Sequence, residues 1–330
     1  MSAVERRPVP AQTADRPTHR PGSAPWQARL LLLASIWGMS FVFIKVGDEA
    51  FSPLWVVLGR MLFGTAMLIA ILAVRRERLP RGALLWGQLA IAAVLFNVAP
   101  FTLFAYGETR TTSVLAGIWN ATTPLLTLLI AMLVLPDDPP TRRRLAGLAV
   151  GFSGVLVVLG VWQGLGGRAL LGNLACLGAA ACYGLAFPFT RRYLAGRPES
   201  TVALATAQLL CGTLELALIT PLTSGIPGHL PLRATASIFA LGAFGTGIAY
   251  VLNYGLIRDA GITIASMVTY LVPLFSTAAG VLILGEPLTW NEPVGALVVI
   301  AGIAITQNRL RWPGRTSQRD RSGRRSVSSR

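Results

Sequence analysis

Charged residues are scarce in this sequence, and almost none of them is lysine. Only 13% of the 330 residues are charged, against about 25% in an ordinary soluble domain. A soluble fold of this length would need many more polar residues to cover its surface. The single lysine, Lys45, is followed by Val46, whereas a phosphate-binding loop of the Walker A type needs Gly-Lys-Ser/Thr. ATP hydrolysis through such a loop is therefore excluded.

Cysteine and histidine are too few for most sites that they build. The three cysteines, Cys176, Cys182 and Cys211, lie in apolar stretches, where we expect small core residues rather than disulfides or ligands. The two histidines, His19 and His229, lie far apart in polar segments. The sequence has no HExxH or GxSxG motif, which are signatures of hydrolases. We predict no catalytic residues, no metal centre and no cofactor, and hence no enzyme.

Long apolar runs are what the sequence has in abundance. Hydrophobic residues make up 53% of the chain, and the mean hydropathy is +0.59. Ten runs of a length close to the ~20 residues that span a bilayer alternate with short polar breaks. We predict an all-α polytopic membrane protein with ten transmembrane helices, between disordered tails at 1–27 and 311–330. The runs are 28–47, 54–74, 83–106, 111–135, 145–162, 170–190, 201–221, 235–256, 262–284 and 293–310.

The basic residues lie almost entirely on one side of these ten runs. Exceptions are Arg110, Arg168 and Arg233 in opposite gaps, and Lys45 and Arg60 within the runs. This is the positive-inside pattern of membrane proteins. It predicts a multi-pass protein of the plasma membrane, the inner membrane of a bacterium, with both termini in the cytoplasm. The net charge of +15 is then chiefly a topology signal that contacts lipid, and we expect no nucleic-acid partner.

The two halves of the chain resemble each other at a nearly constant offset of 146 to 149 residues. Because each half holds five runs, the second copy must enter the membrane from the opposite side. Inverted repeats of this kind are typical of secondary transporters. We predict two five-helix repeats, at 28–162 and 170–310. The matches are Ile36–Lys45 with Cys182–Arg191, Tyr106-Gly107 with Tyr254-Gly255, Pro124-Leu125 with Pro273-Leu274, and Gly147…Gly154 with Gly295…Gly302.

Several short motifs in this repeat resemble a known family. They are Trp37-Gly38-Met39-Ser40-Phe41, Gly59-Arg60, Pro273-Leu274, Leu284-Gly285-Glu286-Pro287-Leu288-Thr289 and Gly295…Gly302. Together they are similar to the drug/metabolite transporter superfamily in its EamA-type two-repeat form. The first repeat departs at Leu135–Asp138, and the second has Gln208 where the first has Arg60. The resemblance implies transport without ATP, often export, of amino acids, related small metabolites or drugs.

Polar and aromatic side chains inside apolar helices are the candidates for a substrate cavity. Asn120 and Thr123, for example, lie on one face of their helix. The alternative is that such side chains only bond neighbouring helices. The resemblance implies that the first, third, fourth, sixth, eighth and ninth helices line the cavity, and these helices carry the candidates. They are Trp37, Ser40, Phe41, Asn97, Phe101, Trp119, Asn120, Thr123, Tyr183, Phe187, Tyr250, Asn253, Thr269 and Tyr270.

Prolines and ionisable residues within the runs carry separate predictions. Pro124 and Pro273 are expected to kink their helices at equivalent depths. Arg60 is expected to pair with a carbonyl, an acidic loop residue or lipid phosphate, and Glu215 is the one acid placed well inside a run. Both are candidates for ion or proton coupling. Lys45 is expected to reach the membrane surface.

Other functions and partners stay open at this point. The predicted partners are a small-molecule substrate, membrane lipid and, as a candidate, a proton. The glycine-rich runs 145–162 and 293–310 are expected to pack closely, either within one chain or across a homodimer. A flippase for a lipid-linked substrate and a membrane sensor or assembly partner without transport are the alternatives to a metabolite transporter.

Overall fold

The computed structural model describes residues 26–134, 141–160, 167–194, 197–260, 265 and 268–306. The tails at 1–25 and 307–330, and with them most of the predicted disordered segments, lie outside these residues. So do Leu135–Asp138, where the first repeat departs from the family pattern.

Every element of the described residues is helical, as an all-α protein requires. The α-helices of the first half are α1 (Trp26–Asp48), α2 (Pro53–Val74), α3 (Ala83–Ala93), α4 (Ala99–Glu108), α5 (Ser113–Asn120), α6 (Thr123–Val134) and α7 (Arg142–Leu159). Those of the second half are α8 (Gly167–Tyr193), α9 (Thr201–Ser224), α10 (Leu232–Gly242), α11 (Ala249–Ala260), α13 (Val268–Leu284) and α14 (Asn291–Thr306). Two short π-helical segments, η1 (Val94–Val98) and η3 (Ala243–Ile248), join α3 to α4 and α10 to α11.

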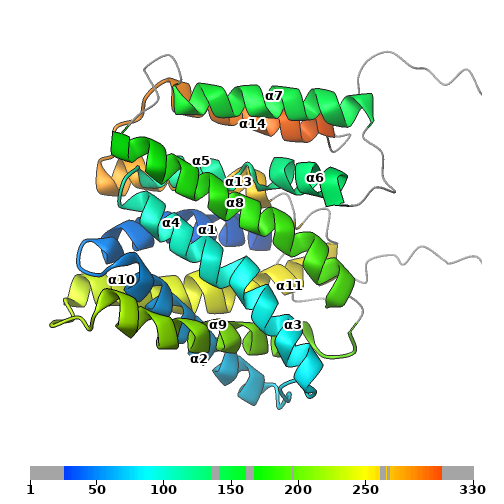
Figure 1. The fold of residues 1–330 in the computed structure, drawn as a ribbon, viewed down its shortest axis with the longest axis vertical. Helices are drawn as coiled ribbons and strands as arrows, with labels where there is room; N and C mark the ends of the chain where they lie inside the picture. Colours follow the sequence, from blue (N-terminus) through cyan, green and yellow to red (C-terminus); the bar gives the residue numbers. More distant parts are fainter. Residues whose placement is uncertain are drawn as a thin grey trace, which may run out of the picture.

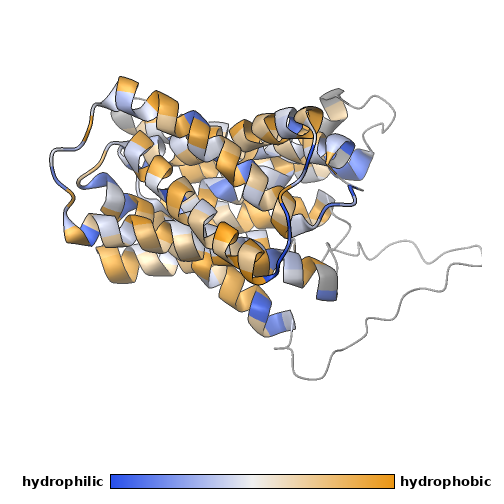
Figure 2. Cartoon of the chain, turned by 90° about the horizontal axis from the view of Figure 1, so that it is seen from below, coloured by the Kyte–Doolittle hydropathy of each residue, from blue (hydrophilic) through white to orange (hydrophobic). Residues whose placement is uncertain are grey.

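Seven helical stretches of the described residues are long and apolar enough to cross a membrane, and three of them, Ala83–Glu108, Ser113–Ile130 and Leu232–Ile257, combine consecutive helices. The helices α13 and α14 are shorter apolar helices. Large apolar side chains such as Leu218, Leu222 and Leu282 are 71%, 87% and 82% exposed, which water would penalise and lipid would not. Figure 2 shows hydrophobic residues along the helices and hydrophilic ones gathered at their ends and in the loops. The chain is therefore a polytopic helical membrane protein, whereas ten as the number of spans stays a prediction.

Helices from corresponding places in the two halves lie side by side (Figure 1). The helix α7 packs along α14 at one edge of the molecule, and α2 packs along α9 near the opposite edge. Between them, α1 packs on α13, and α8 packs on both α4 and α6. Such pairing is expected when two related halves face each other across a pseudo-two-fold axis.

The pairing of α7 with α14 uses the glycines that the sequence singled out. A Cβ added to Gly302 would lie 2.4 Å from the backbone nitrogen of Gly151, and one added to Gly154 would lie 2.6 Å from that of Val299. Only glycine permits this approach of two backbones. These close contacts are made within one chain, which is one of the two arrangements that the sequence left open.

The fourth apolar run is broken rather than kinked. The helix α5 ends at Asn120 and α6 begins at Thr123, so Pro124 is the second residue of a new helix, where proline fits without loss of a hydrogen bond. By contrast, Pro273 lies inside α13. The predicted equivalence of the two prolines is thus not seen in the helix boundaries.

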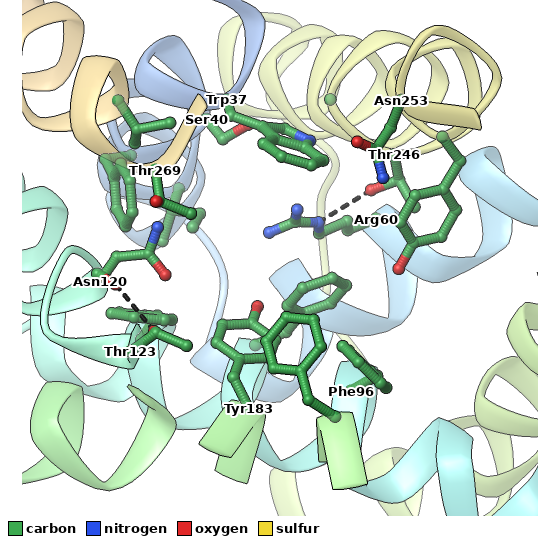
Figure 3. Close-up of a pocket in the computed structure, with 18 residues that line it drawn as sticks. Trp37, Ser40, Arg60, Phe96, Asn120, Thr123, Tyr183, Thr246, Asn253 and Thr269 are labelled. Atoms are coloured by element: carbon green, nitrogen blue, oxygen red, sulfur yellow. Dashed lines mark hydrogen bonds between the residues drawn. The ribbon is translucent and has the colours of Figure 1, made fainter. Parts of the chain in front are cut away.

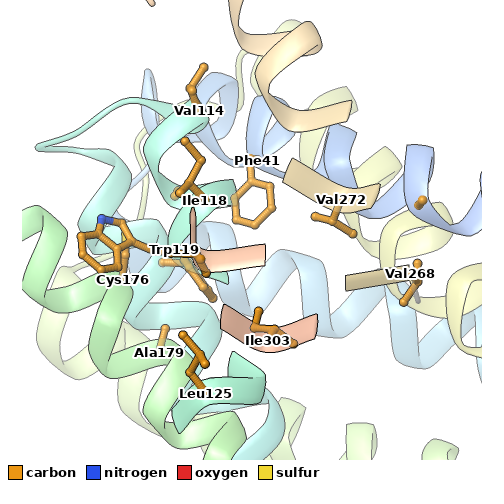
Figure 4. Close-up of a cluster of buried hydrophobic side chains, with 14 of the residues drawn as sticks. Phe41, Val114, Ile118, Trp119, Leu125, Cys176, Ala179, Val268, Val272 and Ile303 are labelled. Carbon is orange, nitrogen blue, oxygen red and sulfur yellow. The ribbon is translucent and has the colours of Figure 1, made fainter. Parts of the chain in front are cut away.

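A core of buried side chains connects the helices on both sides of the α5–α6 break. In Figure 4 it brings together Phe41, Trp119, Leu125, Val272 and Ile303 from five different helices. The indole of Trp119 is 1% exposed, and its Nε1 donates a hydrogen bond of 2.9 Å to Oδ1 of Asn173 on α8. This core therefore joins helices of both halves.

Candidate functional site

A cavity of about 210 Å³ lies between the two halves near the middle of the helices. Both halves contribute to it through α1, α2, the η1–α4 and η3–α11 segments, α5, α6, α8 and α13. The lining residues are Trp37, Ser40, Phe41, Ile44, Arg60, Phe96, Phe101, Phe104, Asn120, Thr123, Tyr183, Phe187, Gly245, Thr246, Tyr250, Asn253, Thr269 and Val272.

Most of the side chains expected at a cavity lie on this wall. Asn120 and Asn253 stand on opposite sides of the space in Figure 3, one from each half. Of the expected residues, only Asn97, Trp119 and Tyr270 are not part of the lining. Trp119 belongs to the core described above, and Tyr270 packs against the same core. Asn97 is buried directly behind the wall and is 0% exposed.

The partner of Arg60 in the cavity wall differs from the one that the sequence suggested. We expected its partner to be a carbonyl, an acidic loop residue or lipid phosphate. Instead, its Nε donates a hydrogen bond of 2.9 Å to Oγ1 of Thr246 in the other half, and its guanidinium carbon lies 3.6 Å from the ring centroid of Phe101. No acid of the described residues lies within ion-pair distance of it. In Figure 3 the guanidinium end points into the cavity. The cavity wall therefore holds a positive charge.

A related chain of hydrogen bonds occupies the matching place in the second half. Gln208, which corresponds to Arg60, donates from Nε2 to Oδ1 of Asn97 at 2.7 Å. The Asn97 Nδ2 in turn donates to the hydroxyl of Tyr250 at 2.8 Å. Asn97 thus orients a wall residue from behind. The two networks differ in charge, because glutamine replaces the arginine, so the cavity carries its cation on one side only.

Each network includes a residue of a π-helical segment. Asn97 lies in η1 and Thr246 lies in η3, at the same place in each half. A π-helical turn widens the backbone and is frequent at functional sites. Here each π-helical turn accepts a hydrogen bond from a helix of the opposite half, η3 from Arg60 on α2 and η1 from Gln208 on α9. Polar side chains in apolar runs hinted at these positions, but periodicity alone gives no signal for a π-turn.

The candidates for ion coupling fall in different places. Arg60 lies in the cavity wall, whereas Glu215 is a half-buried residue of α9 outside it. The Nζ of Lys45 donates to the backbone carbonyls of Glu108 and Thr111, and its reach to the membrane surface stays a prediction. Sequence reasoning missed Glu108, because the third run was ended at residue 106. The helix α4 continues to Glu108, whose side chain is fully buried.

Comparison with known proteins agrees with this architecture. The sequence matches the EamA-like transporter family twice, over residues 25–160 and 170–307. A relative from Chlamydia trachomatis serovar L2, named S-adenosylmethionine/S-adenosylhomocysteine transporter, is 30% identical over 84% of this chain and 86% of its own. Protein PecM of Dickeya dadantii is 24% identical over 83% of this chain and 89% of its own.

The fold also has a counterpart among solved structures. One crystal structure covers 86% of this chain and 99% of its own with a TM-score of 0.61 at 20% identity, a likeness that concerns the fold alone. The family and the relatives named as transporters are not enzymes, which confirms that expectation. The resemblance found in the motifs is confirmed as well. The double family match and the helical fold together show that the chain belongs to the EamA-like transporter family.

Proposed function

We propose that this protein is a secondary transporter that exports a small metabolite with one carboxylate, such as an amino acid or a related compound. The single observation that carries the proposal is the position of Arg60, a cation in the wall of a central cavity without an acidic partner among the described residues. The inverted repeat supports alternating access, because two related halves allow two equivalent packings.

A guanidinium in this setting favours a carboxylate. Arginine offers donors in a planar fork that matches a carboxylate with two parallel hydrogen bonds. A charge inside a membrane protein is costly unless something compensates it, and a substrate carboxylate would do so when bound. One cation suits one carboxylate better than it suits a multiply charged phosphate ester.

The rest of the wall suits an apolar or aromatic substrate body. Trp37, Phe96 and Tyr183 surround the space in Figure 3, while Asn120 and Asn253 offer amides on either side. A volume of about 210 Å³ is below the roughly 300–1,000 Å³ of pockets for drug-sized ligands. These features support a substrate of amino-acid size with an uncharged side chain.

The relative from Chlamydia supplies a second candidate. S-adenosylmethionine and S-adenosylhomocysteine, which its name gives as substrates, each carry one carboxylate on an amino-acid end and an aromatic purine at the other. Arg60 and the aromatic wall suit both ends. Such a molecule is larger than an amino acid, so its transport would require the cavity to widen.

The decisive experiment is transport into liposomes that contain the purified protein. The panel should hold labelled neutral amino acids, S-adenosylmethionine, S-adenosylhomocysteine and, for each compound, its amide or decarboxylated form, together with a fluorescent lipid. Each is tested with and without a proton gradient. We expect flux or exchange of carboxylates and at least tenfold less of the matched compounds that lack the carboxylate. Folded protein that moves none of them, or moves only a fluorescent lipid, would refute a carboxylate transporter, and the second outcome would favour a flippase.

A further inference from the structure

Glu108 at the end of α4 is an acidic side chain that nothing in the transport cavity uses. It is 0% exposed, and neither of its carboxylate oxygens has a hydrogen-bond partner in the described part of the chain. A buried carboxylate without donors is strongly disfavoured as an ion, whereas the neutral acid is far less costly to bury. In this packing the side chain therefore holds its proton.

The balance of charged groups around Glu108 also favours a bound proton in this region. They come from several elements and are Lys45 and Asp48 on α1, Arg60 on α2 and Glu286 after α13, with the thiol of Cys176 on α8 nearby. Three carboxyl groups and two cations leave one negative charge that a bound proton would balance, and Glu108 is the fully buried one of the two acids that lack hydrogen-bond partners.

Two other members of this cluster are engaged elsewhere, whereas the carboxylate oxygens of Asp48, a less buried residue than Glu108, also lack hydrogen-bond partners in the described residues. Lys45 donates to backbone carbonyls, one of them that of Thr111 at 2.7 Å, and not to a carboxylate. Glu286 accepts from the backbone N–H groups of Ser113 and Val114 at 2.9 and 3.1 Å, so it caps the start of α5. The described residues hold no group of acids, cysteines or histidines that is fit to bind a metal ion.

Glu108 also lies where the two halves close against each other. A Cβ on the preceding residue, Gly107, would come within 2.5 Å of the Sγ of Cys176 on α8. The nearby Thr111 donates from Oγ1 to Oδ1 of Asn173 on α8 at 3.3 Å. We call this region, where α4 ends against α8, the Glu108 end. Opening the cavity here must part α4 from α8 and admit water to the carboxyl.

We propose that Glu108 is a proton-binding site whose occupancy is linked to the closing of this end. When the Glu108 end is closed, the carboxyl carries one proton. When the end opens, water solvates the side chain, and the carboxyl releases its proton to water. Whatever stabilises the open end must then weaken proton binding by the same factor, since linkage is reciprocal. The proposal rests on the transporter function above and identifies the proton as the ion linked to opening and closing.

Cys176 is a native reporter for the test. Its side chain is 0% exposed and faces Gly107, so it becomes accessible only when α4 and α8 separate. In a Cys182→Ala/Cys211→Ala background it is the only thiol. The rate of its labelling by a polar maleimide in nanodiscs, between pH 6 and 8.5 and without any substrate, measures opening. Because maleimide reacts faster with any water-exposed thiol as the pH rises, each rate is compared with that of Glu108→Gln in the same background.

The expected result is a difference that grows with pH. Labelling of the parent and of Glu108→Gln should agree at low pH, where both side chains are neutral. At high pH the parent should be labelled at least fivefold faster. Identical pH profiles would overturn the proposal, and so would Glu215→Gln abolishing the pH response while Glu108→Gln keeps it. A response to sodium at constant pH that Glu108→Gln removes would assign a metal cation instead.

An infrared measurement covers the case in which Glu108→Gln does not fold. A neutral carboxyl has a C=O band distinct from that of a carboxylate, and ¹³C-labelled glutamate shifts it. The parent protein at neutral pH should show a shifted neutral-acid band, and its absence would refute the bound proton. Neither readout needs a transported compound. A failed transport panel with a positive labelling result would therefore count against the carboxylate substrate and not against the proton site.

Discussion

The substitution Arg60→Gln tests the carboxylate-binding role of the cavity most directly. Glutamine is the residue that the second half has at the corresponding position, Gln208, where it bonds the π-helical segment of the other half. We therefore expect the substituted glutamine to keep a hydrogen bond to Thr246 and the fold to survive. What disappears is the positive charge and its stacking on Phe101.

The magnitude follows from the bonds that a bound carboxylate would lose. A hydrogen bond to a charged group contributes about 1.5–3 kcal/mol, and 1.4 kcal/mol corresponds to tenfold in affinity. Losing one such bond should weaken binding of a carboxylate substrate roughly 10- to 150-fold. The matched amide should lose little, because it never had the charge. Arg60→Lys should lie between, since lysine is a point charge without the planar fork.

The assay is a binding titration of the purified protein by calorimetry or by substrate-induced thermal stabilisation, with the carboxylate and its amide side by side. The quantity that matters is the ratio of the two dissociation constants in each variant. If Arg60→Gln leaves that ratio unchanged while the protein remains folded, Arg60 does not bind the carboxylate and the reasoning fails.

Three further predictions concern the cavity and the packing around it. Asn120→Leu and Asn253→Leu should each lower flux at least tenfold at unchanged expression in the liposome assay, and persistent flux would show that the cavity is misassigned. Gly302→Ala should lower the free energy of unfolding by about 1–3 kcal/mol, because the added Cβ would clash with backbone atoms. The control Gly87→Ala, whose Cβ would lie in open space, should be neutral or slightly stabilising in the same melting experiment. Glu286→Gln should lower the free energy of unfolding by about 1–3 kcal/mol, because it weakens the cap on α5. An unchanged melting temperature would argue against that role.

The sequence was most informative wherever the bilayer imposes a simple rule. Lipid cannot satisfy backbone polar groups, so long apolar runs had to become helices, and they did. The constant offset between matching motifs predicted related halves, and the family match covers both. Polar side chains in lipid-spanning helices are costly, which is why Asn120, Tyr183 and Asn253 pointed to a cavity wall.

These rules could not predict the contacts between the two halves. Whether Arg60 turns to lipid or to Thr246 depends on a neighbour 186 residues away in the chain, and no periodicity encodes that pairing. Glu108 was placed in a loop, because hydropathy ends a span a residue or two before the helix does. Its burial depends on elements far away in the sequence, among them α8, which packs against the neighbouring Gly107. Composition and spacing thus specified a helical protein of two related halves, and the motifs added the resemblance to a transporter family. The charge in the cavity and the buried acid at its end depend on how the two halves meet.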